Sequence, residues 1–156
     1  MFVILFICTG NTCRSPMAQY LMEKLIVQAG LEGEISVRSA GLSALEGDAM
    51  SQGAQTALLR RGAPLIDAHA AQRVTNEHVN TADLVLTMTQ SHKRALLDVF
   101  PTHKEKIWTL LEYADMRRSL DIEDPYGQED DVYERTAQQI EEACSIILQK
   151  VRSHIS

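Results

Sequence analysis

The chain has 156 residues, the size of one domain with a hydrophobic core of its own. Hydrophobic residues make up 45% and charged residues 23%, as in ordinary globular proteins, and the net charge of −6 argues against nucleic-acid and anionic-membrane surfaces. Cys8, Cys13 and Cys144 are too few for a disulfide framework, and no apolar run is long enough to span a membrane. We therefore expect a single cytoplasmic domain over residues 1–156.

Apolar runs alternate with amphipathic stretches along the chain. Continuous apolar runs predict buried strands at 2–8 and 82–88. The alternating segment "EISVRS" predicts a strand at 34–39, and "KIWTLL" predicts a last short strand at 106–111. Helices are predicted at 16–29, with Ser15 as N-cap and Pro16 in the first position, at 51–61 before Gly62 and Pro64, at 89–99 and at 130–152. This alternation indicates an α/β fold with a parallel sheet and right-handed crossovers.

The octapeptide "CTGNTCRS" follows the first strand at its carboxyl end, where parallel sheets bind ligands. Backbone N–H groups of such a loop converge on anions, and the helix that follows adds positive potential. Gly10 permits a tight turn, Asn11 tolerates a left-handed backbone, and the planar guanidinium of Arg14 matches two phosphate oxygens. Positive surroundings favour the thiolate of Cys8, to which Ser15 could also donate. The loop is therefore predicted to bind phosphate and direct a thiolate at it, with no metal or other cofactor.

A leaving group also needs a proton, for which a carboxyl group is the usual donor. Asp121, Glu123 and Asp124 lie together in the polar segment "DIEDPYG", more than 100 residues after Cys8. Spacing alone does not choose among them. Pro125 restricts the backbone of Asp124, which favours this carboxyl group.

Four motifs in order resemble landmarks of the low-molecular-weight protein tyrosine phosphatases: "CTGNTCRSP", "SAG" at 39–41, "ADLVLTMT" at 82–89 and "DPYG" at 124–127. The resemblance covers nearly the whole chain and implies a four-stranded parallel sheet, doubly wound, with helices on both faces. It further implies these roles: nucleophile for Cys8, phosphoryl binding for Arg14, loop stabilisation for Asn11, thiolate stabilisation for Ser15 and general acid for Asp124.

The position of Thr12 bears on the substrate, because tyrosine phosphatases of this family usually carry an aliphatic residue there. Tyr126 is followed by Gly127 rather than by a second aromatic residue, and the loop at 42–52 has no aromatic residue. The chain thus resembles the bacterial protein arginine phosphatases, which implies phosphoarginine proteins as substrates and an opposing protein arginine kinase. Phosphotyrosine is the alternative substrate. The residues expected to bind substrate are Thr9, Gly10, Asn11, Thr12, Cys13, Ser15 and Tyr126.

Other classes are less well supported. Arsenate reductases of this fold need two further cysteines in mid-chain, and none lies between Cys13 and Cys144. A non-catalytic anion-binding or redox-sensing module would not need the full set of catalytic residue types, although Cys13 is near enough in sequence to form a disulfide with Cys8 on oxidation. Cys144 is expected in the core. The five histidines, at positions 69, 78, 92, 103 and 154, lack metal-ligand spacing and are expected to be surface or helix residues.

Overall fold

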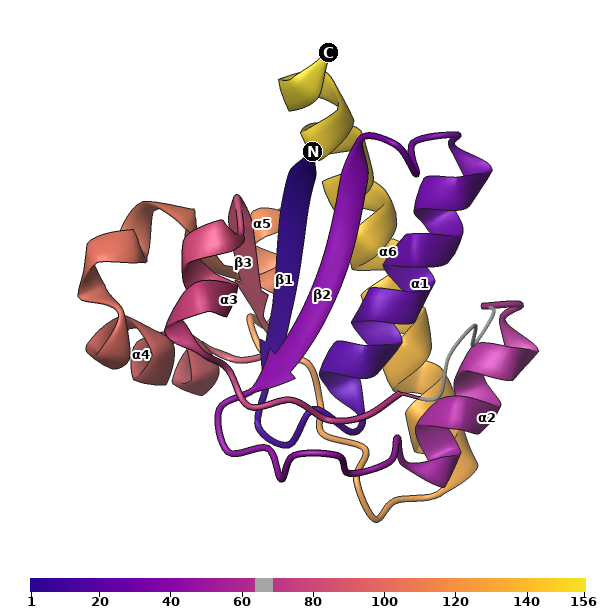
Figure 1. Cartoon of the computed structure of the whole chain (residues 1–156). Helices are drawn as coiled ribbons and strands as arrows, with labels where there is room; N and C mark the ends of the chain where they lie inside the picture. The colour runs from indigo at the N-terminus through magenta and orange to yellow at the C-terminus, as the bar shows by residue number, and fades with distance from the viewer. Residues whose placement is uncertain (64–68) are drawn as a thin grey trace.

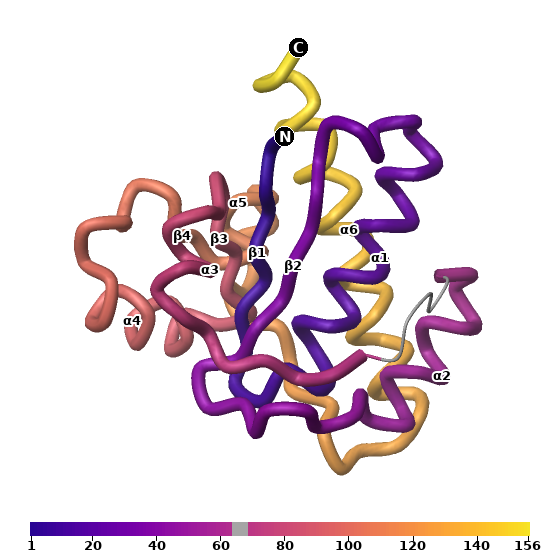
Figure 2. The backbone as a smooth tube through the Cα atoms, viewed as in Figure 1, coloured from indigo at the N-terminus to yellow at the C-terminus, as the bar shows by residue number. Residues whose placement is uncertain are grey.

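A computed structural model describes residues 1–63 and 69–156, so Pro64 lies outside the described residues. Its four strands form one all-parallel sheet in the order β2-β1-β3-β4, which Figure 2 traces along the backbone. The strands are β1 (Phe2–Cys8), β2 (Ile35–Gly41), β3 (Leu84–Thr87) and β4 (Ile107–Thr109). The chain leaves β1 for one neighbour and returns to pair on its other side, so the strand order switches beside β1. The predicted four-stranded, doubly wound α/β fold is confirmed.

Helices cover both faces of this sheet (Figure 1). They are α1 (Arg14–Gln28), α2 (Gln52–Arg60), α3 (Asn76–Thr81), α4 (Gln90–Val99), α5 (Leu110–Tyr113) and α6 (Asp130–Ile155), with a 3₁₀ helix at Pro101–Lys106. The long α1 and α6 pack against one face, and α3 and α4 against the other.

Strand β1 is the centre of two hydrophobic cores. Ile4 and Phe6 point to the core beneath α1 and α6, and Leu5 and Ile7 point to the core beneath α3 and α4. All four side chains are fully buried, and each such burial stabilises the fold by about 1.5–3 kcal/mol. Cys8 belongs to the α1 and α6 side by the same alternation. The strand thus fixes both the position and the direction of the cysteine.

Several predicted boundaries were wrong for identifiable reasons. Helix α3 was not predicted; Thr75 begins it, accepting a hydrogen bond from the His78 amide. The last strand ends at Thr109 rather than at residue 111, because Thr109 caps α5 in a reciprocal pair with Glu112. The 3₁₀ helix after α4 was also missed. The second strand extends through Gly41, which pairs with Cys8.

Gly41 must be glycine because the backbone of the loop after β1 passes directly over it. A Cβ atom at this position would lie 2.5 Å from the Thr9 carbonyl oxygen and 3.0 Å from the Asn11 amide nitrogen. Backbone atoms cannot rotate away as a side chain could. The loop after β1 and the end of β2 therefore fit together only through this missing side chain.

We expect Gly41→Ala to lower stability by about 1–3 kcal/mol, the usual result of overpacking, and to reduce catalytic activity by displacing the loop. Thermal unfolding and turnover of an aryl phosphate would be measured together. Gly33→Ala is the matched control, because nothing lies within 4 Å of its added Cβ. An unchanged melting temperature for Gly41→Ala would show that the loop adjusts freely.

Candidate active site

The loop singled out by the sequence joins the carboxyl end of β1 to the first turn of α1. Cys8 is the last residue of β1, Arg14 is the first residue of α1, and both are buried. Between them, Asn11 has a φ of 57°, in the left-handed region that its residue type tolerates. The loop therefore makes a tight curl at the edge of the sheet where ligands are expected.

The fully buried Asn11 side chain ties this loop to three other segments. Its Nδ2 donates to Ser15 Oγ (2.8 Å) and to Ser39 Oγ on β2 (3.0 Å). Its Oδ1 accepts from the backbone amide of Gln72 (2.9 Å). The backbone carbonyl oxygen of Asn11 lies 2.8 Å from His69 Nε2. Every polar atom of the side chain thus has a partner. Sequence reasoning missed Ser39, His69 and Gln72, and only the "SAG" motif at 39–41 gave any signal for them.

Ser15 lies beneath the nucleophile and not at a helix cap. Its Oγ is 2.9 Å from Cys8 Sγ and already accepts a hydrogen bond from Asn11, so its own proton is free for the sulfur. A hydrogen bond to the charged form of a group stabilises that form. The prediction that Ser15 is the N-cap of α1 was wrong: Cys13 occupies that position, without a side-chain cap, and the Ser15 hydroxyl contacts the sulfur instead.

Arg14 is held from behind by a carbonyl group. Its Nη1 donates to the Ile122 carbonyl oxygen (3.0 Å), and its Nη2 lies 3.6 Å from Asp124 Oδ2. The guanidinium is thus nearly buried yet lines the pocket above Cys8. This arrangement keeps positive charge at the pocket floor with little loss of side-chain entropy on binding an anion.

The three carboxyl groups of the 121–124 loop have different partners. Asp121 Oδ1 accepts from the Gln90 amide at the start of α4 (2.8 Å), and Glu123 pairs with Arg135 on α6 (3.0 Å). Neither carboxylate lines the pocket above the thiol. Two of the three acid candidates are therefore occupied in holding the loop.

Asp124 is the carboxyl group that faces the pocket. It lies 3.6 Å from Arg14, and its side chain remains 55% exposed. Its Oδ1 accepts from the Tyr126 amide (3.1 Å), which fixes the orientation of the carboxyl group. Geometry thus agrees with the sequence-based preference for Asp124, whose function as the acid stays a prediction.

The pocket above the thiol has a volume of about 280 Å³. Its lining contains the predicted Cys8, Thr9, Gly10, Thr12, Cys13, Arg14, Asp124 and Tyr126, together with Ser43, Leu45 and Asp48. Asn11 and Ser15 lie outside the lining and support the loop. Ser43, Leu45 and Asp48 were not predicted, since nothing in the 42–52 loop distinguishes them before β2 brings that loop beside the first.

Cys13 faces both the pocket and the interior. Its thiol donates to Ser51 Oγ (3.1 Å) and lies 3.6 Å from the Tyr133 hydroxyl. Burial raises the pKa of Tyr133 to about 12, which keeps this phenol neutral. All three cysteines are free thiols. Oxidative pairing of Cys13 with Cys8 stays a prediction.

Two histidines have site positions that the sequence did not indicate. His69 contacts the Asn11 carbonyl group, and His92, which is 7% exposed, has its Nε2 2.8 Å from Thr9 Oγ1. His92 lies in helix α4, as expected, but it is buried against the loop, whereas His69 lies outside the helices and is half-buried beside Asn11. Their contacts cross 58 and 83 residues of sequence, so no local spacing reveals them.

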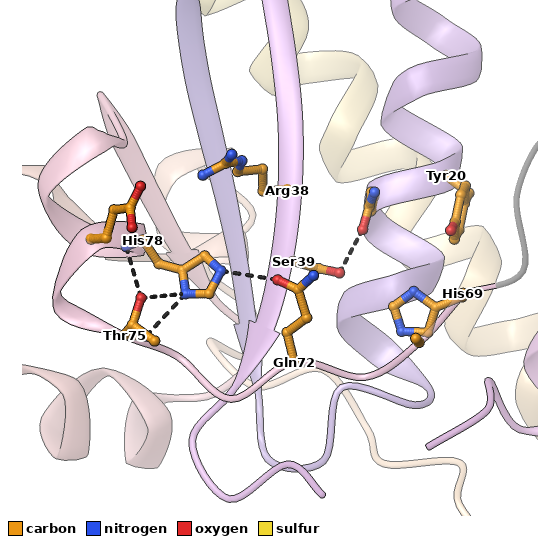
Figure 3. A pocket seen from close by; sticks show the side chains of 10 residues that line it. Tyr20, Arg38, Ser39, His69, Gln72, Thr75 and His78 are labelled. Carbon is orange, nitrogen blue, oxygen red and sulfur yellow. Dashed lines mark hydrogen bonds between the residues drawn. The ribbon is translucent and has the colours of Figure 1, made fainter. Parts of the chain in front are cut away.

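A second, larger pocket of about 550 Å³ adjoins the Asn11 network. Ser39, His69 and Gln72 line this pocket. Figure 3 shows the hydrogen bonds of Gln72 with His78 and of Ser39 with a neighbouring glutamine. Because these three residues also hold Asn11, this pocket is part of the support for the loop. Its lining contains no cysteine.

Together these residues define a class of protein. A thiol lies at the floor of an anion-binding loop, an arginine beside it can neutralise phosphoryl oxygens, and a carboxyl group faces both from the rim. This is the set of groups that nucleophilic phosphoryl transfer requires. The fold and site are those of a cysteine-dependent phosphatase.

Comparisons with known proteins agree. The family model described as low molecular weight phosphotyrosine protein phosphatase matches residues 3–156, and the chain belongs to this family. It is 38% identical over 139 residues to a protein-arginine-phosphatase of Bacillus subtilis (89% of each chain) and 35% identical over 151 residues to the human phosphotyrosine phosphatase (94% of each). A solved YwlE arginine phosphatase variant with a phosphorylated active-site serine superposes with a TM-score of 0.90 at 34% identity, covering 97% of this chain and 96% of that one.

As a member of this family, the chain is a metal-independent protein phosphatase that uses cysteine as its nucleophile. Within residues 1–63 and 69–156, no three His, Cys, Asp or Glu side chains gather as a metal site would require. Over the same residues, no helix is long and apolar enough to cross a membrane.

We expect Cys8→Ser to abolish turnover and retain phosphate binding, because a hydroxyl is a far poorer nucleophile than a thiolate. Aryl phosphate hydrolysis and calorimetric phosphate binding would be measured. Cys144→Ala is the control, since burial raises the pKa of the Cys144 thiol and keeps it inert. Substantial turnover by Cys8→Ser would exclude Cys8 as the nucleophile.

Asp124→Asn should lower kcat by about 10²–10⁴, the usual contribution of general acid–base catalysis. Asp121→Asn should leave kcat nearly unchanged, because an amide oxygen can still accept from the Gln90 amide. Steady-state kinetics on one aryl phosphate, with thermal unfolding of both variants, would distinguish them. The assignment of Asp124 would be wrong if the larger loss belonged to Asp121→Asn.

Proposed function

We propose that this protein is a protein arginine phosphatase, which hydrolyses phosphoarginine side chains through a cysteinyl-phosphate intermediate. The observation that carries this proposal is the set of hydrogen-bond acceptors in the pocket wall above the thiol. Thr12, Asp48 and Asp124 line it, and its one aromatic residue, Tyr126, is 69% exposed. The similarity to protein-arginine-phosphatases of Bacillus subtilis and Geobacillus stearothermophilus supports the same substrate.

A guanidinium group and a phenyl ring require different walls. The N–H groups of a phosphoarginine side chain need acceptors when they leave water, because an unpaired buried donor costs roughly 1–3 kcal/mol. Asp48 supplies such an acceptor: within residues 1–63 and 69–156, its carboxylate has no hydrogen bond or ion pair. The Thr12 hydroxyl is also available, since its contact with Cys13 Sγ, at 3.9 Å, is long.

In the first step, Cys8 Sγ attacks phosphorus in line with the phosphorus–nitrogen bond. The sulfur–phosphorus bond forms as the phosphorus–nitrogen bond breaks, and Asp124 gives its proton to the departing guanidine nitrogen. Arg14 and the backbone N–H groups of the loop stabilise the charge on the phosphoryl oxygens. The products are an unphosphorylated arginine side chain and a phosphocysteine.

In the second step, water attacks phosphorus from the side that the guanidine has left. Asp124, now a carboxylate, takes a proton from this water as the sulfur–phosphorus bond breaks. Inorganic phosphate is released, and Cys8 returns as a thiolate stabilised by Ser15. Thr12, which lines the same pocket, helps position the water.

A phosphotyrosine phosphatase is the second candidate. Leu45 and Tyr126 at the rim are both exposed and could contact a phenyl ring, and the human relative is named for phosphotyrosine. The two carboxylates of the pocket favour the cationic substrate, because they would lose hydration against a ring without gaining a partner.

Family membership implies phosphorylated proteins as substrates. The finer proposal is that they carry phosphoarginine, that a protein arginine kinase opposes the reaction, and that both act in the cytoplasm. The bacterial arginine phosphatase relatives support it, as do the free thiols, which a reducing compartment preserves.

Thr12→Ile should lower kcat/KM for a phosphoarginine peptide by about one to two orders of magnitude, at 1.4 kcal/mol per tenfold. The same change should maintain or raise kcat/KM for a phosphotyrosine peptide, since a methyl-rich wall suits a ring. Both substrates are measured on one preparation so that folding losses cancel. Thr12→Ser, which retains the hydroxyl, is the control and should keep the preference for phosphoarginine. Equal losses on both substrates would remove Thr12 from substrate selection.

A further inference from the structure

The imidazole of His92 contacts the residue that follows the nucleophile. His92 lies in the first turn of α4 and is 7% exposed, and its Nε2 is 2.8 Å from Thr9 Oγ1. Thr9 itself is exposed to solvent and lines the pocket together with Cys8 and Asp124. A helix from the other half of the chain thus fixes one hydroxyl group beside the thiol.

The burial of the second ring nitrogen determines which atom carries the proton. His92 Nδ1 is buried and has no hydrogen-bond partner among residues 1–63 and 69–156. A neutral imidazole has one N–H donor and one acceptor nitrogen, and buried N–H groups without partners are rarer than acceptors without them. We therefore assign the proton to Nε2, which donates to Thr9 Oγ1. The hydroxyl proton of Thr9 is then free to be donated elsewhere.

The electrostatic surroundings keep this imidazole neutral. Burial, followed by the positive charge of Arg14, lowers the pKa of His92 to about 4, against smaller opposing effects of Asp124 and Asp121. A neutral ring holds Thr9 without adding a second cation beside Arg14. The hydrogen bond to Thr9 is thus present at neutral pH in a single protonation state.

We propose that His92 is a positioning residue that turns the Thr9 hydroxyl into a directed hydrogen-bond donor to a phosphoryl oxygen in the transition state. Thr9 Oγ1 accepts from His92, so its proton points away from the imidazole and towards the pocket that Thr9 lines. A donor held in place before the reaction stabilises developing charge without reorganisation. This inference concerns phosphoryl transfer itself and does not depend on phosphoarginine as the substrate.

The test is a double-mutant cycle with Thr9→Val and His92→Leu on an aryl phosphate, which makes the outcome independent of the amino acid that is dephosphorylated. Each single change should lower kcat/KM about tenfold, the effect of about 1.4 kcal/mol. The double variant should be no worse than Thr9→Val, because His92 acts through the hydroxyl. Vanadate, which mimics the transition state, should bind less tightly to both single variants, while phosphate affinity should change by less than threefold.

His92→Gln gives a rescue, since its side-chain amide can place a donor where Nε2 lies; it should retain most of the activity that His92→Leu loses. The proposal would be overturned if the losses in kcat/KM of the two single variants multiplied in the double variant. It would also be overturned if the affinities for vanadate and phosphate fell equally, because His92 would then only pack α4 against the sheet. Thr9→Val removes a single hydroxyl from an exposed residue, so it tests the proposal even if His92→Leu unfolds. Unchanged kcat/KM and vanadate affinity in Thr9→Val would also overturn it.

Discussion

The buried side chain of Asn11 is the interaction on which the rest of the site depends. A left-handed backbone between a strand and a helix is unfavourable for most residues. A buried side-chain amide without partners would also lower stability, because it would lose its hydrogen bonds to water and gain none in the protein. Asn11 meets both requirements because Ser15, Ser39 and the Gln72 backbone complete its hydrogen bonds. The same contacts hold three segments of the chain around one residue. The shape of the phosphate-binding loop is therefore a property of the tertiary structure.

Strand β1 fixes the position of the nucleophile, Cys8, which is its last residue. Its alternating side chains enter two separate cores, so a rotation or a shift in register would disrupt the packing of both. Cys8 ends the strand beside the point where the strand order switches. The position of the thiol is thus supported by the whole sheet, which suits a reaction that needs in-line attack.

Of the carboxyl groups in the 121–124 loop, two hold the loop in place and one faces the pocket. Asp121 and Glu123 hold the loop to α4 and α6, which leaves Asp124 facing the pocket near Arg14. Asp48 adds a second carboxylate at the opening. One buried cation at the floor and two carboxylates above it form a field that suits a substrate with an anionic end and a cationic stem, as phosphoarginine has.

The sequence by itself determined the elements whose signals are local. The unbroken apolar run predicted β1, the residue type of Asn11 predicted its left-handed backbone, and the Cys8 to Arg14 loop predicted an anion site at the end of the first strand. Ser15 was misassigned as a helix cap, and the contact of His92 with Thr9 was not predicted, because the partners of these side chains are not next to them in sequence. Only the tertiary structure showed these contacts, and it places Asp124, which the sequence already favoured, beside Arg14. Hydrogen bonds and burial depend on which segments the sheet brings together, and sequence spacing does not record distances across a sheet.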